Sequence, residues 1–474
     1  MLGRTRHVHF VGIGGIGMSG IAELLVNLGY EVSGSDAKRS EVTDRLRQLG
    51  VRVVTGHDAS HVGRADVVVV SSAIRDDNVE VAAASARHVP VIPRAEMLAE
   101  LMRLRYGIAV AGAHGKTTTT SMVALVLERA GLDPTAVIGG RLSAFGSNAR
   151  LGRGELMVAE ADESDRSFLK LSPAIAVVTN LDREHMESYG SWEHLQQAFV
   201  DFANKVPFYG AVVACMDDAA VRAILPRITR RVITYGLATG EAAADTDLLG
   251  QNFELVAFGS RASLTFRTQD GPRPLGEIQL RVPGRHNMLN ALAAVAVALE
   301  LDVPFEPVAA ALREFRGAER RFELRGEERN VMVVDDYGHH PTEIAAVIAA
   351  ARAGLDRRVV VVFQPHRFTR TQQLQPEFAA ALRRADAILL TDIYPAGEAP
   401  IPGVTIEALA DAVEAAAPGR VHLVKSLEDI PAAVAGLARP GDIVITLGAG
   451  SIGTTAEPIL AALRGTERGG GVGP

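Results

Sequence analysis

A short glycine loop that carries a lysine gives the strongest chemical signal in the sequence. Residues 111–118 read Ala-Gly-Ala-His-Gly-Lys-Thr-Thr. Backbone amides of such a loop cradle phosphates, its lysine reaches the β- and γ-phosphates, and the hydroxyl that follows can bind Mg²⁺. The full Walker pattern has a further glycine where this chain has Val110, so the loop is a shortened form. The chain has five lysines and 44 arginines, so a lysine here is hard to ascribe to chance. We predict ATP binding by Gly112, Ala113, His114, Gly115, Lys116, Thr117 and Thr118.

A second glycine motif lies near the N-terminus. Residues 12–17 read Gly-Ile-Gly-Gly-Ile-Gly, and Asp36 follows 19 residues after the last glycine. Such glycines let backbone amides approach a diphosphate at the start of a helix, and the acidic residue can hold a ribose hydroxyl. The motif therefore predicts a nucleotide diphosphate on Gly12, Gly14, Gly15, Gly17 and Asp36. It does not say which nucleotide, and a tight turn that needs only small residues is the alternative.

Two further segments carry candidate metal ligands. Residues 160–165 read Glu-Ala-Asp-Glu-Ser-Asp, directly after the strand expected for residues 155–159. A carboxylate at the end of a strand beside a phosphate-loop strand suits Mg²⁺, and Glu160, the first residue after the expected strand, is the ligand we predict. A solvated acidic turn is the alternative. Residues 179–185 end on His185, which could bind a second metal ion; taken alone, it reads more simply as a surface histidine.

Further candidate contacts with a nucleotide lie between residues 287 and 321. Asn287 and Asn290 open an expected helix, where one could cap the helix and the other could present its amide to a base. Arg320 and Arg321 lie near the boundary of the last segment, either in a solvated linker or within reach of phosphate.

The last third of the chain has polar or glycine-rich residues after three expected strands. These are residues 335–343, 364–370 and 448–453. Open α/β sheets bind ligands beyond the carboxyl ends of their strands, and paired basic residues there suit a carboxylate or a phosphate. Three such segments at one edge of the sheet predict a ligand-binding site there.

The elements that must position these residues follow an α/β pattern. Short β-branched runs alternate with alanine- and leucine-rich helical stretches, which favours parallel sheets. The 474 residues suggest about three domains. We predict a Rossmann-like domain at 1–104, a central P-loop ATPase-like domain at 105–317, a Rossmann-like C-terminal domain at 318–464, and a mobile tail at 465–474. The central domain should have a parallel sheet and, in residues 239–274, a small antiparallel meander.

Composition excludes several classes of protein. With 47% apolar and 22% charged residues, the chain is globular rather than disordered, collagenous or coiled-coil. A net charge of −7 argues against a nucleic-acid binder. No apolar run approaches the roughly 20 residues of a membrane span. The single cysteine, Cys215, favours a reducing, cytoplasmic setting.

The five motifs, in this order and over nearly the whole chain, resemble the Mur ligase family. They read Gly-x-Gly-Gly-x-Gly-Met, Gly-x-His-Gly-Lys-Thr-Thr, Glu-Ala-Asp-Glu-Ser-Asp, His-Asn-x-x-Asn and Asp-Asp-Tyr-Gly-His-His-Pro. The resemblance is closest to the branch that adds L-alanine. The helix expected at 192–204 lacks the modified lysine of several later-step ligases, which supports this assignment. It implies that MgATP phosphorylates the lactyl carboxylate of UDP-N-acetylmuramate and that the amine of L-alanine then attacks the acyl phosphate.

The resemblance also implies roles for single residues. Lys116 would neutralise the transferring phosphoryl group, Thr117 and Glu160 would hold Mg²⁺, and His185 would meet a second Mg²⁺, which reverses the simpler interpretation above. The other implied contacts are Asn287 and Asn290 with adenine, Arg321 with phosphates, Asp336 with the nucleotide or substrate pocket, His339, Arg367 and Arg370 with the muramoyl carboxylate and the amino acid, and Ser71 and Ser72 with the uridine.

Other interpretations of the sequence compete with this one. An NAD-dependent oxidoreductase would explain the first glycine motif but not Lys116, and a non-catalytic nucleotide-binding module would leave the last third without a role. A muropeptide-recycling ligase of the same family is the nearest rival. The sequence leaves the oligomeric state open between monomer and homodimer.

Overall fold

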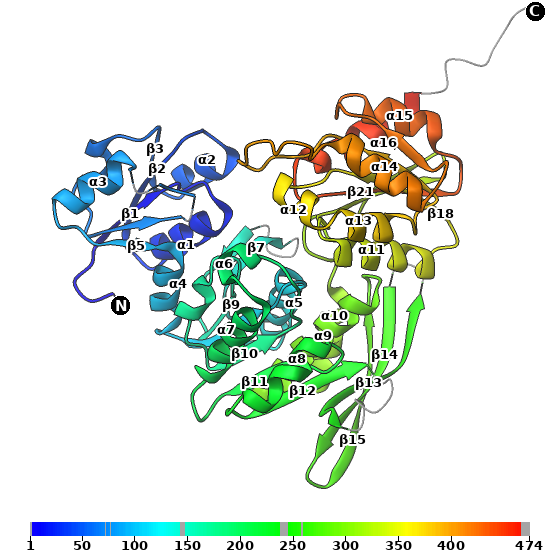
Figure 1. Ribbon diagram of the computed structural model, residues 1–474. Helices are drawn as coiled ribbons and strands as arrows, with labels where there is room; N and C mark the ends of the chain where they lie inside the picture. The colour runs from blue at the N-terminus through cyan, green and yellow to red at the C-terminus, as the bar shows by residue number, and fades with distance from the viewer. Residues whose placement is uncertain are drawn as a thin grey trace, which may run out of the picture. The chain divides into compact units, whose positions relative to one another are not determined.

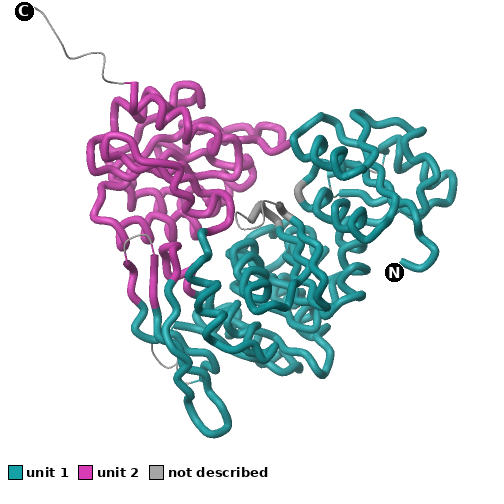
Figure 2. The backbone as a smooth tube through the Cα atoms, turned by 180° about the vertical axis from the view of Figure 1, so that it is seen from behind, with its two compact units in different colours: residues 1–253, 262–279, 289–316 teal, residues 254–261, 280–288, 317–474 magenta. Residues whose placement is uncertain are grey.

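The computed structural model describes residues 2–71, 73–75, 77–142, 147–237, 245–256 and 259–465. Within these residues the chain forms three sheets flanked by helices (Figure 1). By its internal contacts it divides into two compact units (Figure 2). Unit 1 comprises residues 1–253, 262–279 and 289–316, and unit 2 comprises residues 254–261, 280–288 and 317–474. No helix of the described residues has the length and apolarity that a membrane crossing requires.

The first sheet is parallel and has the strand order β3-β2-β1-β4-β5. Its strands are β1 (His7–Val11), β2 (Glu31–Asp36), β3 (Arg52–Thr55), β4 (Val67–Val70) and β5 (Val91–Pro93). The connecting helices are α1 (Ile16–Asn27), α2 (Glu41–Gln48), the short 3₁₀ helix η1 (Ala59–Val62), α3 (Val79–Ala86) and α4 (Arg94–Met102). All of β1 is buried, as expected of a strand covered on both faces.

Side-chain caps set where two of these helices begin. The hydroxyl of Ser40 accepts a hydrogen bond from the amide of Thr43 at the start of α2. The side chain of Asn78 accepts bonds from the amides of Glu80 and Val81 at the start of α3. Both caps satisfy amides that have no partner inside the helix.

The second sheet is mixed and has ten strands among the described residues, in the order β15-β14-β13-β12-β11-β10-β6-β9-β7-β8. They are β6 (Tyr106–Ala111), β7 (Thr135–Leu142), β8 (Ser147–Arg150), β9 (Leu156–Glu160), β10 (Ile175–Val178), β11 (Ala211–Cys215), β12 (Val232–Leu237), β13 (Leu248–Val256), β14 (Gly259–Thr268) and β15 (Gly271–Leu280). The helices are α5 (Lys116–Arg129), α6 (Met186–Tyr189), α7 (Trp192–Asn204), α8 (Ala219–Ile224), α9 (Arg285–Glu300) and α10 (Phe305–Glu314), with 3₁₀ helices η2 (Ser167–Lys170) and η3 (Leu225–Arg227).

The third sheet lies in unit 2 and has the order β16-β17-β21-β18-β19-β20. Its strands are β16 (Glu323–Glu328), β17 (Val331–Asp336), β18 (Arg358–Phe363), β19 (Ala387–Leu390), β20 (Val421–Leu423) and β21 (Asp442–Leu447). Only the edge pair β16–β17 is antiparallel among the described pairs of this sheet. Helices α11 (Pro341–Gly354), α12 (Phe368–Gln373), α13 (Gln375–Leu382), α14 (Ile406–Ala416), α15 (Ile430–Leu437) and α16 (Ala456–Gly465) and the 3₁₀ helix η5 (Ser451–Thr455) complete the unit.

The α/β architecture predicted from the sequence is confirmed, with parallel sheets and a mixed central one. The predicted meander corresponds to β13, β14 and β15, which are neighbours in the central sheet and extend to Leu280. The predicted boundaries at 104, 317 and 464 stay predictions, and of the predicted tail only Gly465 is described.

Strands β9 and β17 end later than predicted, and both differences concern acidic residues. Glu160 is the last residue of β9 rather than the first residue after it. Asp335 and Asp336 belong to β17, which was expected to end at Val334. In each case ladder pairing with a neighbouring strand extends the strand, Glu160 lying opposite Val110 and Asp336 opposite Leu447. Tertiary pairing therefore outweighs the low strand propensity of acidic residues.

A buried carboxylate joins several elements of the first sheet. Glu80 of α3 is fully buried, with 0% exposed surface. Its oxygens lie 2.8 Å from Nε2 of His9, 2.8 Å from the hydroxyl of Ser35 and 3.2 Å from Nδ1 of His57. Nδ1 of His61 lies 3.3 Å away. Burial raises the pKa of Glu80, but the hydrogen bonds from His9 and Ser35 outweigh it and lower the pKa to about 2. The carboxylate therefore stays ionised at neutral pH.

We expect Glu80→Gln to remove a pH-dependent part of the stability. A folded-state pKa below the ordinary value of 4.5 gives stability that is present above pH 4.5 and is lost as the pH falls towards 2. The shift corresponds to about 3 kcal/mol. Thermal unfolding should find the variant less stable than wild type above about pH 5, with a difference that shrinks towards pH 3. The exposed Glu41→Gln is the matched control, and a pH-independent difference for Glu80→Gln would contradict the argument.

Candidate functional site

The phosphate-binding loop joins the buried strand β6 to the N-terminus of α5. Two of its glycines have backbone conformations that side chains rarely adopt, with φ of 145° at Gly112 and 79° at Gly115. A Cβ atom on Gly112 would lie 2.0 Å from Oγ1 of Thr179, and one on Gly115 would lie 2.6 Å from Oδ1 of Asn290. The first four amides of α5 have no partner in the helix, so the loop offers donors to an anion.

The segment that follows β10 fixes the middle of this loop. The side-chain amide of Asn180 accepts a hydrogen bond from the amide of His114 at 2.7 Å and donates one to its carbonyl at 2.9 Å. The hydroxyl of Thr179 donates to the same carbonyl at 2.8 Å. Nε2 of His114 lies 2.9 Å from a carboxylate oxygen of Asp182. The side-chain amide of Asn180 thus bonds to both the backbone amide and the backbone carbonyl of His114, as the backbone of a neighbouring β-strand would.

Lys116 is held inside the loop. Its Nζ donates to the carbonyls of Gly112 and Ala113 at 2.7 and 3.1 Å and to the carboxylate of Glu163 at 2.9 Å. Burial lowers the pKa of Lys116, but the carboxylates of Glu163 and Glu160 outweigh burial and raise it, so the side chain is a cation. Burial raises the pKa of Glu163, and the lysine opposes that rise.

Thr117 and Glu160 form the next pair. The hydroxyl of Thr117 donates to Oε2 of Glu160 at 2.9 Å. The pair arises because β6 and β9 are parallel neighbours that place Glu160 beside Val110. Thr118, by contrast, is 5% exposed on the buried side of α5.

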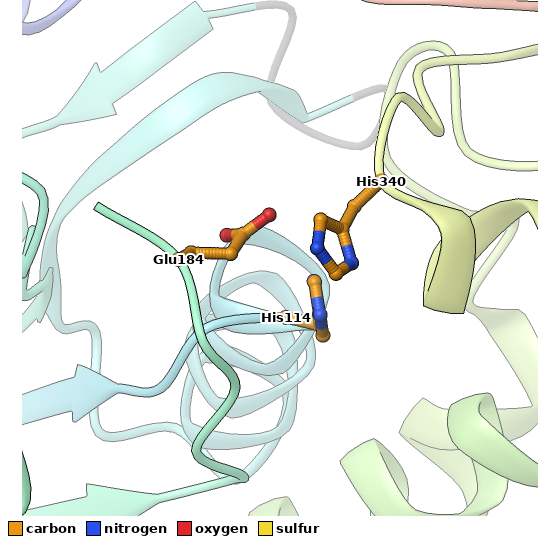
Figure 3. Close-up of side chains that lie close together, drawn as sticks. All are labelled: His114, Glu184 and His340. Atoms are coloured by element: carbon orange, nitrogen blue, oxygen red, sulfur yellow. The ribbon is translucent and has the colours of Figure 1, made fainter. Parts of the chain in front are cut away.

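His185 lies close to two carboxylates. The ligand atoms of Glu163, Glu184 and His185 all lie within 4.8 Å of one another, a spacing that could hold a metal ion. The ligand atoms of His114 and Glu184 also lie within 4.8 Å of each other, and Figure 3 shows both side chains beside the phosphate loop. His185 has a left-handed backbone with φ of 54° and stands directly before α6.

Asn290 lies against the loop from α9. Its Oδ1 accepts a hydrogen bond from the hydroxyl of Thr119 at 3.1 Å, and both residues are buried. Asn287 belongs to unit 2, and its side chain donates to the carbonyl of Pro283 at 2.7 Å. The structure therefore joins Asn290 to the phosphate loop within unit 1.

The first glycine loop has its own neighbours. The amide of Gly14 donates to Oδ2 of Asp36 at 2.8 Å, and a Cβ on Gly12 would lie 3.5 Å from the hydroxyl of Ser71. A Cβ on Gly17 would lie 2.9 Å from Nη1 of Arg94. Gly15 has an extended backbone and caps α1. Ser72 lies outside the described residues.

Unit 2 contains a separate group of predicted site residues. Asp336 accepts backbone bonds from Phe322 and Gly338, each at 2.7 Å. Burial raises its pKa to about 6, although Arg321 opposes the rise. A guanidinium nitrogen of Arg321 lies 3.2 Å from a carboxylate oxygen of Glu343. Asp336 therefore fixes the backbone that follows Arg321.

Basic side chains gather beyond β18 in the same unit. Arg367 has a left-handed backbone with φ of 75°. Neither Arg367 nor Arg370 forms an ion pair within 4.0 Å among the described residues, although the charge of Arg367 helps to lower the pKa of Glu398. The ring of His366 lies 5.7 Å from that of His339 and stacks on Tyr394 at 5.4 Å. Burial, with His339 and Arg370, lowers the pKa of His366 to about 4. Two guanidinium groups without an ion pair, beside the ring of His366, suit an anionic ligand.

Five residues that contact these loops were missed as site residues. Thr179, Asn180, Asp182 and Glu163 contact the phosphate loop. Arg94 lies beside Gly17 and 3.6 Å from Asp162. Asn180 and Glu163 stand in motifs that the sequence displays, so the strand–loop context was an available signal for them. Arg94 had no such signal, because its contact with Gly17 joins residues 77 positions apart.

We expect Asn180→Asp to weaken ATP binding. A carboxylate cannot donate to the carbonyl of His114, so one hydrogen bond is replaced by repulsion between oxygens. The loss of about 1–3 kcal/mol corresponds to a dissociation constant raised about tenfold to hundredfold. Isothermal titration with ATP measures it, and the exposed Asn252→Asp is the control. An unchanged dissociation constant would remove Asn180 from the positioning of the loop.

Comparison with known families places matches along most of the chain. The model described as "Mur ligase family, catalytic domain" matches residues 7–106, "Mur ligase middle domain" matches residues 110–298, and "Mur ligase, glutamate ligase domain" matches residues 320–450.

Curated relatives are similar over almost the full length. A UDP-N-acetylmuramate–L-alanine ligase of Geotalea daltonii is 54% identical over 98% of this chain and 99% of its own. The enzyme of that name from Myxococcus xanthus is 55% identical over 98% of this chain and 97% of its own.

Solved structures share the fold. The UDP-N-acetylmuramate–alanine ligase of Thermotoga maritima has a TM-score of 0.81 and 29% identity, covering 98% of this chain and 100% of its own. A murein peptide ligase of Psychrobacter arcticus has a TM-score of 0.69 and 26% identity, covering 97% of this chain and 99% of its own.

Proposed function

Because the chain belongs to the Mur ligase family, we propose that it joins L-alanine to the lactyl carboxylate of UDP-N-acetylmuramate at the expense of ATP, in the synthesis of peptidoglycan precursors. The observation that carries the proposal is a phosphate loop with a buried cationic Lys116, in a chain that is 54% identical over 98% of its length to a relative named for this reaction.

The chemistry explains why a phosphate loop is needed. A carboxylate is a poor electrophile, so a carboxylate oxygen first takes the γ-phosphoryl group of ATP and releases ADP. The amine nitrogen of L-alanine then attacks the carbonyl carbon of the acyl phosphate, the C–O bond to phosphate breaks, and the nitrogen loses a proton. Such steps need positioning and neutralisation of charge more than covalent chemistry by the protein.

Residues of unit 1 would bind and orient ATP. The loop amides of residues 112–118 would receive the phosphates, and Lys116 would neutralise charge on the transferring group. Asn180 would hold His114 so that these amides keep their direction. Asn290, which lies against Gly115, would contact adenine.

The donor set beside the loop fits Mg²⁺. Thr117 and Glu160 offer two oxygens 2.9 Å apart, and Mg²⁺ prefers oxygen ligands. Glu163, Glu184 and His185 form a second group with the spacing of metal ligands. The residues that would hold the ion are Thr117 and Glu160 at the first position and His185 at the second. When bound, Mg²⁺ supplies positive charge to the phosphates.

The remaining substrates would bind elsewhere in the chain. The first glycine loop, with Asp36, Ser71 and Ser72, would hold the UDP-sugar. In unit 2, Arg367, Arg370 and His339 would bind the carboxylates of the muramoyl group and of L-alanine, and Arg321 and Asp336 would complete the nucleotide and substrate contacts. The only cysteine, Cys215, is buried, in accord with the cytoplasmic location that we propose.

A muropeptide-recycling ligase and an NAD-dependent oxidoreductase are not favoured. The murein peptide ligase structure is 26% identical to this chain, whereas relatives named for the L-alanine reaction reach 54–55%. An oxidoreductase would give no role to Lys116.

We expect release of inorganic phosphate to require ATP, Mg²⁺, UDP-N-acetylmuramate and L-alanine together, because the acyl phosphate must form before the amine reacts. Lys116→Ala should lower the rate by about a hundredfold or more, since it removes a charge that faces the transferring group. A coupled phosphate assay measures both. Turnover with a muropeptide but not with L-alanine would indicate the recycling reaction instead, and near-normal activity of Lys116→Ala would remove the loop from the mechanism.

We expect Gly14→Val to abolish binding of the UDP-sugar and to leave ATP binding intact. A Cβ on Gly14 would lie 2.8 Å from Oδ2 of Asp36, so a larger side chain would fill the space beside the loop. UDP-N-acetylmuramate at a hundredfold excess over its dissociation constant should stabilise wild type by about 2.7 kcal/mol, and NAD should not. Thermal unfolding with each ligand measures this, and loss of the ATP effect as well would argue against separate sites.

A further inference from the structure

The carboxylate of Glu163 lies next to the buried ammonium group of Lys116. Its two oxygens lie 2.9 and 2.8 Å from Nζ of Lys116. The side chains are 4% and 14% exposed, respectively, so water contributes little to either charge. A buried pair of this kind persists only because each ion compensates the other.

The backbone around Glu163 is held firmly. The hydroxyl of Tyr189 donates to the carbonyl of Glu163 at 2.6 Å, and the amide of Arg166 donates to the same oxygen at 3.0 Å. The hydroxyl of Ser188 donates to the carbonyl of Ser164 at 2.7 Å. These bonds anchor the acidic turn to α6, so the contact with Lys116 is part of the fold rather than an accident of a loose side chain.

Neighbouring carboxylates have other partners. Glu160 accepts from Thr117, Asp162 lies 3.6 Å from Arg94 and accepts from the amide of Ser164, and the exposed Asp165 accepts from the amide of Ser167. Within this acidic segment, Glu163 is the residue with a hydrogen bond to Lys116.

We propose that Glu163 is the resting counter-ion of Lys116 and that the phosphates of ATP must displace it to bind. The proposal rests on the proposed function only in taking the loop as the ATP site. An ammonium group with three donors, two of them used by Gly112 and Ala113, has one left for an anion. Glu163 and a phosphate oxygen therefore compete for the same proton of Lys116.

If Glu163 competes with the phosphates, its replacement should tighten ATP binding. The loss of a residue with a purely structural role would not tighten it. Nucleotide affinity is reduced by the fraction of protein in which Lys116 is engaged elsewhere. Replacing Glu163 by a neutral isostere removes the hydrogen-bonded competitor and leaves the Lys116 cation with only the more distant charges of Glu160 and Asp162. The variant should therefore bind ATP more tightly, although it loses an ion pair.

The experiment is isothermal titration of ATP into full-length protein in EDTA, without the other substrates, so that no turnover occurs. Glu163→Gln should bind about tenfold to hundredfold more tightly than wild type. Asp165→Asn, two residues along the same turn, should equal wild type. In a Lys116→Met background the substitution Glu163→Gln should no longer tighten binding, because there is no ammonium group to compete for.

Two further measurements keep the test decisive. If Glu163→Gln does not fold, Glu163→Asp, whose shorter side chain contacts Lys116 less closely, should bind more tightly than wild type by a smaller factor. Thermal unfolding should find Glu163→Gln less stable than wild type without ATP and close to it at saturation. Unchanged or weaker ATP binding by folded variants would overturn the proposal. A wild type that binds ATP but releases no phosphate with UDP-N-acetylmuramate and L-alanine would instead contradict the proposed function.

Discussion

The parallel pairing of β6 with β9 and β10 is the constraint on which the nucleotide site depends. Val110 lies opposite Glu160 in one direction, and Ala111 lies opposite Val178 in the other. The carboxyl ends of three strands thus meet at one edge of the sheet, which is where open α/β sheets bind ligands. From this register follow the contact of Thr117 with Glu160, the clamp of Asn180 on His114, and the closeness of Glu163 to Lys116.

Much of this could be predicted from the sequence because the signals are local. Helix α7 begins and ends at the predicted residues 192 and 204, with Ser191 as its N-terminal cap. The phosphate loop was found from seven consecutive residues between a buried strand and a helix. The metal role of Glu160 was predicted from its place beside the phosphate-loop strand, and that of His185 came from the family resemblance; both stay predictions.

What the sequence could not indicate depends on contacts between distant residues. Glu80 lies in an ordinary helical stretch, and only the approach of His9, 71 positions away, makes it a buried anion. An acidic residue at the end of a strand pattern reads as a turn, so the extension of β17 to Asp336 and of β9 to Glu160 was missed. Each of these features exists because tertiary structure supplies a partner that local propensity does not include.

The two glycine loops illustrate how neighbours, rather than glycines, decide what a loop binds. Both follow a buried parallel strand and open a helix, so both offer amides to an anion. In the first loop, the amide of Gly14 donates to the carboxylate of Asp36 and Arg94 lies beside Gly17. This arrangement of a carboxylate and a cation would suit hydroxyl groups and a diphosphate. The second has a lysine enclosed by its own carbonyls and by Glu163. A loop that encloses a lysine cation suits a phosphoryl group that is transferred, whereas a loop with a carboxylate on its amide suits a nucleotide that is only held.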